Sequence, residues 1–252
     1  MTQIVLITGA GTGIGRAIAL TLAEQGFSLM LCGRNLENLE KTKNQLQNSE
    51  NHSTHSCDIK KRGDVKSALE ENNIKSLYGL VANAGIGGEN DYGEKDRWNE
   101  VIETNLTGTY QTVQECLPFL KNNDAPYKKI VILSSILARL GVPGYSAYCA
   151  SKAGLLGLTR SLAAEHSVEK ILINALCPGW VNTNMAKEGI DGFAEALNMS
   201  PEQAYEEAMK QVPLGKMSEP EEIAKFVGYL LSEQQTSLTG QTIDINNGAL
   251  MP

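Results

Sequence analysis

Short apolar runs alternate with longer amphipathic stretches along the whole chain. Stretches such as GRAIALTLAEQG and AGLLGLTRSLAAEHS repeat apolar residues at helical spacing. The runs between them are continuously apolar, which is typical of parallel strands covered on both faces. They occupy residues 3–8, 28–33, 53–57, 76–82, 129–135, 171–177 and 241–246. Because strand and helix alternate, the pattern predicts an α/β fold: a doubly wound parallel sheet of the Rossmann type, in one domain spanning 1–252.

One segment, residues 184–212, breaks this alternation. It is helical in pattern, rich in Glu and Met, and follows the sixth predicted strand. Additional helices at that point would lie over the carboxyl ends of the strands, where sheets of this kind bind ligands. We interpret 184–212 as a substrate lid; an ordinary pair of surface helices is the alternative.

The composition limits the classes of function. The 252 residues, 42% of them hydrophobic, are enough for one sizeable core, and the net charge is -7 with a pI of about 5.1. That charge disfavours nucleic acid or an anionic membrane surface as a partner. No apolar run approaches the ~18 residues that span a bilayer, and the first residues do not resemble a signal peptide. We expect a soluble protein of the cytoplasm.

Neither the cysteines nor the histidines predict a reactive or metal-binding site. The five cysteines are dispersed without a CxxC pair, so buried free thiols are the ordinary interpretation. Cys149 follows Tyr148 directly, but helical geometry directs it away from the face that Tyr148 shares with Lys152. The three histidines have no matched ligands at metal-binding spacing. We therefore predict no metal site.

A glycine-rich loop, TGAGTGIG at residues 8–15, joins the first predicted strand to the first helix. Glycines let the backbone turn sharply and approach a pyrophosphate at the amino end of that helix. A tight turn without a ligand is the alternative. The predicted phosphate-binding residues are Gly9, Thr12, Gly13, Ile14 and Gly15.

The sequence YCASK, residues 148–152, places a phenol and an ammonium on one helical face. Tyr148 and Lys152 are four positions apart and share one environment. A tyrosine ordinarily titrates near pH ~10 and a lysine near ~10.4, so neither is reactive alone at neutral pH. Their pairing indicates that each changes the other's chemistry.

The T-G-x-x-x-G-x-G spacing and the Y-x-x-x-K pair together resemble the short-chain dehydrogenase/reductase family. The resemblance covers nearly the whole chain, with Ala82 standing where the family usually has Asn. The further landmarks occur in the family's order: Asp58, Asn83-Ala84-Gly85, Asn105, Ser135, Pro178-Gly179, Val181 and Thr183.

This resemblance implies a catalytic tetrad for hydride reduction of a ketone. Tyr148 would give a proton to the carbonyl oxygen, and Lys152 would lower the pKa of Tyr148 and hold the nicotinamide ribose. Ser135, thirteen residues before Tyr148, would hydrogen-bond the substrate carbonyl, whereas Ser134 should point to the other side of its strand. Asn105 would continue a proton relay to Lys152 through a water on its carbonyl.

The end of the second predicted strand indicates the cofactor. Gly33 stands where NAD-dependent members of the family carry Asp, and Arg34 follows it. Without a carboxylate, a ribose 2′-phosphate fits there and a guanidinium can bind it, so we predict NADP(H); a solvated loop charge is the alternative for Arg34. The other cofactor-binding residues that the resemblance implies are Asp58, Ile59, Asn83, Ala84, Gly85, Tyr148, Lys152, Pro178, Gly179, Val181 and Thr183.

The predicted function is NADPH-dependent, reversible reduction of a small-molecule ketone to a secondary alcohol. A 3-oxoacyl-[acyl-carrier-protein] or acyl-CoA reductase is the first alternative. Relatives that bind a carrier protein tend to have arginine where this chain has Pro126 and Glu169, which disfavours that alternative. Three lysines lie nearby and leave the point open: Lys128, Lys129 and Lys170. The acidic segment 184–212 also disfavours a strongly anionic substrate. A sugar-nucleotide epimerase or dehydratase and a non-enzymatic dinucleotide sensor are the remaining alternatives.

The family's usual assembly predicts a homotetramer or homodimer. Its contacts would involve helices that begin near residues 99 and 148, together with the last strand. The apolar residues there could equally belong to the core of one chain; they are Val113, Cys116, Leu117, Leu155, Leu158 and Leu162.

Overall fold

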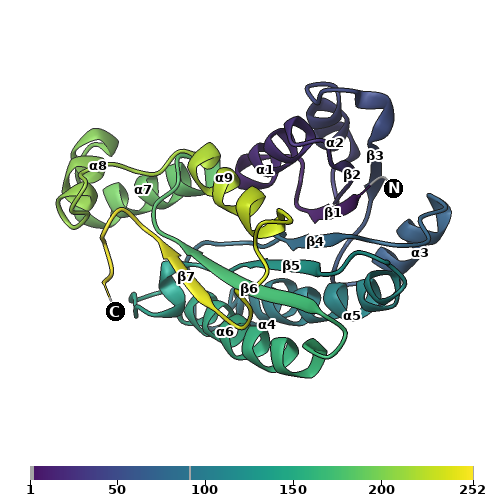
Figure 1. Cartoon of the computed structure of the whole chain (residues 1–252). Helices are drawn as coiled ribbons and strands as arrows, with labels where there is room; N and C mark the ends of the chain where they lie inside the picture. Colours follow the sequence, from purple (N-terminus) through teal and green to yellow (C-terminus); the bar gives the residue numbers. More distant parts are fainter. Residues whose placement is uncertain (1–2, 91, 252) are drawn as a thin grey trace.

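Seven parallel strands form one sheet in the order β3-β2-β1-β4-β5-β6-β7 in the computed structural model, which describes residues 3–90 and 92–251 (Figure 1). The strands are β1 (Ile4–Thr8), β2 (Ser28–Gly33), β3 (Ser53–Ser56), β4 (Gly79–Ala82), β5 (Lys128–Leu133), β6 (Ile171–Pro178) and β7 (Thr242–Ile245). The α-helices are α1 (Gly13–Glu24), α2 (Leu36–Lys43), α3 (Asp64–Glu71), α4 (Trp98–Ile102), α5 (Gly108–Lys121), α6 (Ser146–His166), α7 (Asn184–Leu197), α8 (Pro201–Lys210) and α9 (Pro220–Leu231). The predicted fold class is confirmed.

Alternate strand residues divide the interior into two apolar layers. In β1, Val5 and Ile7 pack with α1 and α9, whereas Leu6 packs on the opposite face with α3, α5 and α6. The same alternation holds in β5, where Val131 belongs to the first layer and Ile132 to the second. Helices on both faces explain why the strands read as continuous apolar runs.

The order of the strands reverses beside β1. The chain adds β2 and β3 on one side of β1 and then returns to add β4 on the other side. Open sheets of this kind bind ligands outside the carboxyl ends of the strands at such a reversal. The glycine loop follows β1 and Asn83 follows β4, so both lie at this point.

Two strand boundaries differ from the sequence prediction by more than one residue. β4 begins at Gly79 rather than residue 76, because the backbone N–H of Leu77 donates to Phe119 of α5 instead of to the sheet. β5 ends at Leu133, and Ser135 caps a short 3₁₀ helix, η3 (Ile136–Ala138). Ser135 therefore lies in a turn after the strand rather than within it.

A π-helical segment, η2 (Glu103–Thr107), joins α4 to α5 and contains Asn105. The sequence analysis expected a helix that begins near residue 99 and did not anticipate this turn. π-helical turns are rare and often occur at functional sites, because the extra residue turns side chains away from their regular positions. Another short 3₁₀ turn, η1 (Ser49–Asn51), precedes β3.

The segment predicted as a lid forms α7 and α8, which lie together at one end of the molecule (Figure 1). The chain enters and leaves this helix pair at adjacent points. Val181 pairs with Ser218 in an isolated bridge, and the N–H of Asn182 donates to the carbonyl of Ser218 at 2.9 Å. The Asn182 side chain also donates to the Glu219 carboxylate at 3.2 Å.

In the described part of the chain, no helix combines the length and apolar character needed to cross a membrane. All five cysteines are free, and Cys32, Cys57, Cys116 and Cys177 are buried, as expected. The thiol of the half-buried Cys149 lies 3.5 Å from the carbonyl oxygen of Leu140.

Candidate active site

A cavity of about 580 Å³ lies where the carboxyl ends of β1, β2, β4, β5 and β6 meet the amino end of α1. It brings together most of the residues predicted from the sequence. Those that line it are Gly9, Thr12, Gly13, Ile14, Gly15, Gly33, Arg34, Asp58, Ile59, Asn83, Ala84, Gly85, Tyr148, Lys152, Pro178 and Thr183.

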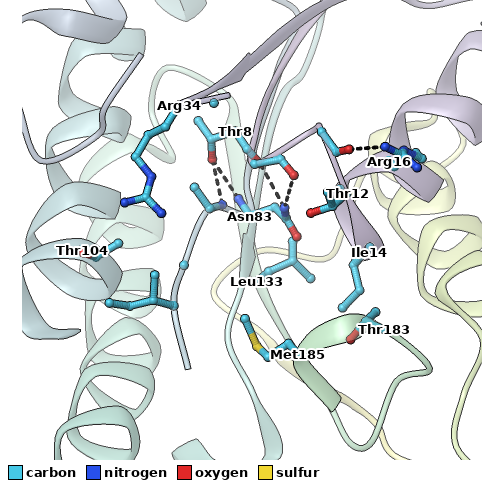
Figure 2. Close-up of a pocket in the computed structure, with 18 of the residues that line it drawn as sticks. Thr8, Thr12, Ile14, Arg16, Arg34, Asn83, Thr104, Leu133, Thr183 and Met185 are labelled. Carbon is cyan, nitrogen blue, oxygen red and sulfur yellow. Dashed lines mark hydrogen bonds between the residues drawn. The ribbon is translucent and has the colours of Figure 1, made fainter. Parts of the chain in front are cut away.

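Thr8 and Asn83 join the two strands at the base of the cavity (Figure 2). The Thr8 hydroxyl accepts from the backbone N–H groups of Asn83 and Ala84, both at 3.0 Å. In return, the Asn83 side chain donates to the carbonyls of Thr8 at 3.0 Å and Gly9 at 3.2 Å. These bonds fix the ends of β1 and β4 relative to each other.

The glycine loop brings backbone into close contact at the start of α1. Gly9 has a φ of +66, and a β-carbon on Gly15 would lie only 2.1 Å from the carbonyl oxygen of Gly9. Only glycine therefore fits at position 15. The first turn of α1 has no acidic residue and no side-chain cap from Thr12 in the described structure. Its free N–H groups and the helix dipole favour an anion.

Arg34 lies at the β2 end of the cavity. Its side chain is exposed, makes no ion pair with any described residue, and extends on the side of Thr104 (Figure 2). Arg16 is differently placed, because its guanidinium donates to Thr42 and to the carbonyl of Gly11. Gly33 leaves space at the strand end, since a β-carbon there would meet only Leu39 Cδ2 at 3.5 Å and Gly9 Cα at 4.0 Å.

Lys152 is buried in the wall of the cavity, one helical turn beyond Tyr148. Its ammonium donates to the carbonyl of Leu133 at 2.9 Å and lies 5.6 Å from the centroid of the Tyr148 ring. Burial lowers the pKa of Lys152 to about 8. The sequence placed the two side chains on one face of the helix, and the structure has both in the cavity.

The expectation that Lys152 makes Tyr148 acidic is not met by the protein's own groups. Burial raises the pKa of Tyr148, and the Ser135 hydroxyl acts in the opposite direction and lowers it. Desolvation penalises the phenolate, while the ammonium is occupied by the Leu133 carbonyl. Tyr148 is therefore held in its protonated form.

Two members of the predicted tetrad, Asn105 and Ser135, are not among the residues that line the cavity. Asn105 is fully buried, and its side chain accepts from the N–H of Ile86 at 2.8 Å and donates to the Ile86 carbonyl at 2.9 Å. Its backbone carbonyl accepts from the Thr109 hydroxyl at 2.7 Å. Ser135 is half-buried, and its oxygen accepts from the N–H of Leu137 at 3.2 Å.

Two predicted cofactor residues also lie outside the lining. Val181 is buried in its bridge with Ser218, and Gly179 packs against Asn246, which a β-carbon would approach to 2.9 Å. Both follow Pro178 closely and support the wall that Thr183 completes. Their assignment to nicotinamide binding stays a prediction.

Sequence reasoning missed several lining residues: Gly11, Arg16, Asn35, Asn38, Leu39, Cys57, Ile86, Thr104, Leu133, Ser134, Asn182, Asn184 and Met185. Ser134 was expected on the far side of its strand, but its hydroxyl donates to the Lys152 carbonyl at 2.9 Å. Met185 begins the segment predicted as a lid, and a β-carbon on Gly87 would lie 3.2 Å from its sulfur. Its position directly after Thr183 and Asn184 was the available signal.

Comparisons with known proteins show that this chain is similar to reductases. A family model described as enoyl-(acyl carrier protein) reductase matches residues 9–249. The 3-oxoacyl-[acyl-carrier-protein] reductase FabG of Rickettsia bellii is 34% identical over 251 residues, covering 99% of this chain and 97% of its own. The corresponding protein of Staphylococcus aureus is 32% identical over 259 residues, covering 100% and 99%.

Two solved structures share the fold over almost their whole lengths. An actinorhodin polyketide ketoreductase with NADPH has a TM-score of 0.92 and 30% identity, covering 98% of this chain and 97% of its own. Levodione reductase has a TM-score of 0.88 and 28% identity, covering 98% and 96%.

Proposed function

Because the chain belongs to the short-chain dehydrogenase/reductase family, we propose that it is an NADPH-dependent ketoreductase, which reduces a ketone to a secondary alcohol. One observation carries this proposal: Tyr148 and Lys152 line the same cavity as the glycine loop and Arg34. A proton donor and a site for a phosphorylated dinucleotide therefore share one space.

The residues present fit NADP(H). The backbone N–H groups at the start of α1 would hold the pyrophosphate, and Arg34 would bind the 2′-phosphate beside Gly33. Asp58 and Ile59 would contact the adenine, and Thr183 with Pro178 the nicotinamide end; all four line the cavity. The bound cofactor supplies the hydride, and all other steps fall to the protein's own groups.

The protein's part in the reaction is to supply and steer one proton. Tyr148, kept protonated by burial, gives its proton to the carbonyl oxygen as negative charge develops there. Ser135 would donate a hydrogen bond to the same oxygen. The positive charge of Lys152 favours the phenolate that remains and would hold the ribose. We assign the relay that returns a proton to Lys152 to Asn105.

A free ketone suits this chain better than a carrier-bound thioester. Lys128 and Lys129 are buried and Glu169 pairs with Lys121 at 2.7 Å, which leaves Lys170 as the exposed lysine of the three that the sequence analysis named. This is little positive charge for docking an acidic carrier. The proposed lid carries Glu188, Asp191, Glu195, Glu202, Glu206 and Glu207 against Lys187 and Lys210. An anionic substrate would meet repulsion there.

Two further features belong to the proposal. We assign α7 and α8 as the substrate lid, supported by Met185 in the cavity wall. A homodimer or homotetramer in the cytoplasm is the expected state, and the five free cysteines suit a reducing compartment. Val113, Cys116, Leu117, Leu155 and Leu162 are core residues, so an interface must use the exposed faces of α5 and α6 instead.

The test is oxidation of NADPH by the purified protein with a panel of carbonyl substrates, and with NADH in parallel. The panel contains diketones, cyclic ketones, 3-oxoesters, 3-oxoacyl-CoA, a 3-oxoacyl carrier protein and a 2-enoyl-CoA. We expect turnover with free ketones and preference for NADPH. Faster turnover of the carrier-bound substrate would reverse the substrate assignment, and no turnover of any ketone would refute the function.

A further inference from the structure

We propose that Ser151 is a positioning residue of this site: it fixes Asn105 to the first turns of α6, which carry Tyr148 and Lys152. For its kinetic consequences, this inference rests on the proposed ketoreductase function. Its structural part can be measured without turnover.

Ser151 makes two side-chain hydrogen bonds while wholly buried. Its relative exposure is 0%, its hydroxyl donates to the carbonyl of Tyr148 at 2.8 Å, and its oxygen accepts from Nδ2 of Asn105 at 3.1 Å. A serine hydroxyl has one hydrogen, which the Tyr148 carbonyl uses. Ser151 can therefore only accept from Asn105, and it selects the NH₂ end of that amide.

The Asn105 amide joins three parts of the fold at one point. Its oxygen accepts from the N–H of Ile86 after β4, and its nitrogen donates to the Ile86 carbonyl and to Ser151. Both N–H hydrogens of the amide are thereby used. The loop after β4, the π-helical segment and α6 thus meet through one side chain.

This junction lies directly behind the reacting groups. A β-carbon on Gly85 would be 3.1 Å from Oδ1 of Asn105 and 3.5 Å from Nζ of Lys152, so both side chains flank the same small space. Asn105 lies in a π-helical turn, where the regular helix ladder does not set its position. Its side-chain bonds must do so, and Ser151 provides the one to the catalytic helix.

Loss of the Ser151 hydroxyl should disturb the site without unfolding it. Ser151→Ala leaves one Asn105 N–H unpaired in a buried position and loosens the first turns of α6. A shift of the catalytic groups by a fraction of an ångström lowers turnover, so we expect kcat to fall roughly 10-fold to 100-fold. The KM for NADPH should change little, because the phosphate and adenine ends are untouched.

A matched control lies two turns further along the same helix. Thr159 is also fully buried, and its hydroxyl donates to the Leu155 carbonyl at 2.8 Å, but it bonds no group of the active site. Thr159→Val removes that hydroxyl at constant shape. The discriminating measurements are kcat and the pH profile of kcat, because both substitutions remove a buried hydrogen bond and both lower stability.

The experiment compares wild type, Ser151→Ala, Ser151→Cys and Thr159→Val. It measures kcat, KM and the pH profile of kcat, and follows amide hydrogen exchange at Ile86, whose N–H is bonded to Asn105. We expect lower kcat, an altered pH profile and faster Ile86 exchange in both Ser151 variants, with wild-type values in Thr159→Val. Adding Ser151→Ala to Asn105→Ala should lower kcat little further, because Ser151 acts through Asn105.

Each outcome decides the inference. Wild-type kcat and wild-type Ile86 exchange in Ser151→Ala would overturn it, as would equal losses in Thr159→Val. If Ser151→Ala does not fold, Ser151→Cys is read in its place, since sulfur keeps the volume and bonds weakly. If the wild type reduces no ketone, the proposed function fails, and Ile86 exchange alone then supports or overturns the positioning role.

Discussion

The ammonium of Lys152 bonds the carbonyl of Leu133 at 2.9 Å, at the end of β5, instead of the phenol of Tyr148. With Nζ 5.6 Å from the centroid of the tyrosine ring, its influence on Tyr148 is a charge acting through space. That influence depends on the ammonium being protonated, and burial lowers the pKa of Lys152 to about 8.

The first prediction concerns pH. Lys152 is charged below about 8 and neutral above it, so kcat for ketone reduction should fall as pH rises through this value. Lys152→Arg keeps the charge at every pH tested, and in it the alkaline fall should move upward even if kcat is lower throughout. Rates from pH 6 to 10 with saturating NADPH measure this. A fall that remains near pH 8 in Lys152→Arg would assign it to another group.

Removing the phenol hydroxyl should abolish most turnover. Tyr148→Phe keeps the ring in the cavity but has no proton to give, so kcat should fall ~10³-fold or more. NADPH affinity, measured by fluorescence titration, should stay nearly unchanged because the ribose partner Lys152 remains. Retained kcat would remove Tyr148 from the mechanism.

Cofactor choice can be tested at Gly33. Aspartate fits there, since its β-carbon would be in ordinary contact with Leu39 at 3.5 Å, and its carboxylate would repel a 2′-phosphate. In Gly33→Asp we expect the kcat/KM ratio of NADPH to NADH to fall by about 10-fold or more, equivalent to about 1.4 kcal/mol. Gly33→Asn has the same shape without the charge and should shift the ratio far less. Equal ratios in Gly33→Asp and wild type would show that position 33 does not discriminate between cofactors with and without the ribose 2′-phosphate.

A second buried lysine gives a prediction about stability. Lys129 is 1% exposed, and burial lowers its pKa to about 8 from an ordinary 10.5, with its ammonium on the Gln235 carbonyl. Between these two values the unfolded chain binds the proton and the folded chain does not, so stability rises with pH. Lys129→Met removes this contribution. The stability of wild type relative to the variant should therefore increase from pH 8 to 10.5 in urea unfolding, and a constant difference would contradict it.

The proposed lid can be tested at Met185. Met185→Ala enlarges the cavity beside Gly87, so kcat/KM for a bulky cyclic ketone should rise relative to a small one by roughly 10-fold. Leu197→Ala, at the far end of α7 and 48% exposed, is the control. If the ratio of kcat/KM for the bulky ketone to that for the small ketone is unchanged in both variants, Met185 does not limit the size of the substrate.

The strands, their parallel direction and the glycine loop followed from the sequence because each leaves a pattern in the order of apolar runs, helices and glycines. Continuous apolar runs indicate strands buried on both faces, and a glycine triplet after the first strand indicates a loop whose backbone can approach a bound pyrophosphate closely. The start of β4 was misplaced because Leu77 bonds to Phe119, a contact between residues far apart in sequence. Such a hydrogen bond produces no periodic pattern of apolar residues in the sequence.

The candidate site was predicted unevenly for the same reason. Tyr148 and Lys152 could be paired from helical spacing, but the Leu133 carbonyl that holds Lys152 could not, because it comes from another strand. The π-helical turn at Asn105 and the hydrogen bond that Asn105 donates to Ser151 depend on packing between α4, α5 and α6. The predicted lowering of the Tyr148 pKa by Lys152 is not met by the protein's own groups, because burial raises this pKa and the opposing contribution comes from the Ser135 hydroxyl.

The bridge between Val181 and Ser218 makes residues 182–217 a closed excursion whose two ends already touch. Lengthening such a loop adds little closure entropy, about 0.6 kcal/mol for each doubling. A longer, shorter or differently charged α7–α8 pair should therefore change the stability of the seven-stranded sheet only slightly. The helix pair can therefore vary between relatives while the phosphate-binding loop and Tyr148 stay the same. A graft of another relative's segment between Val181 and Ser218 that keeps Thr183 should retain the fold and exchange the substrate range.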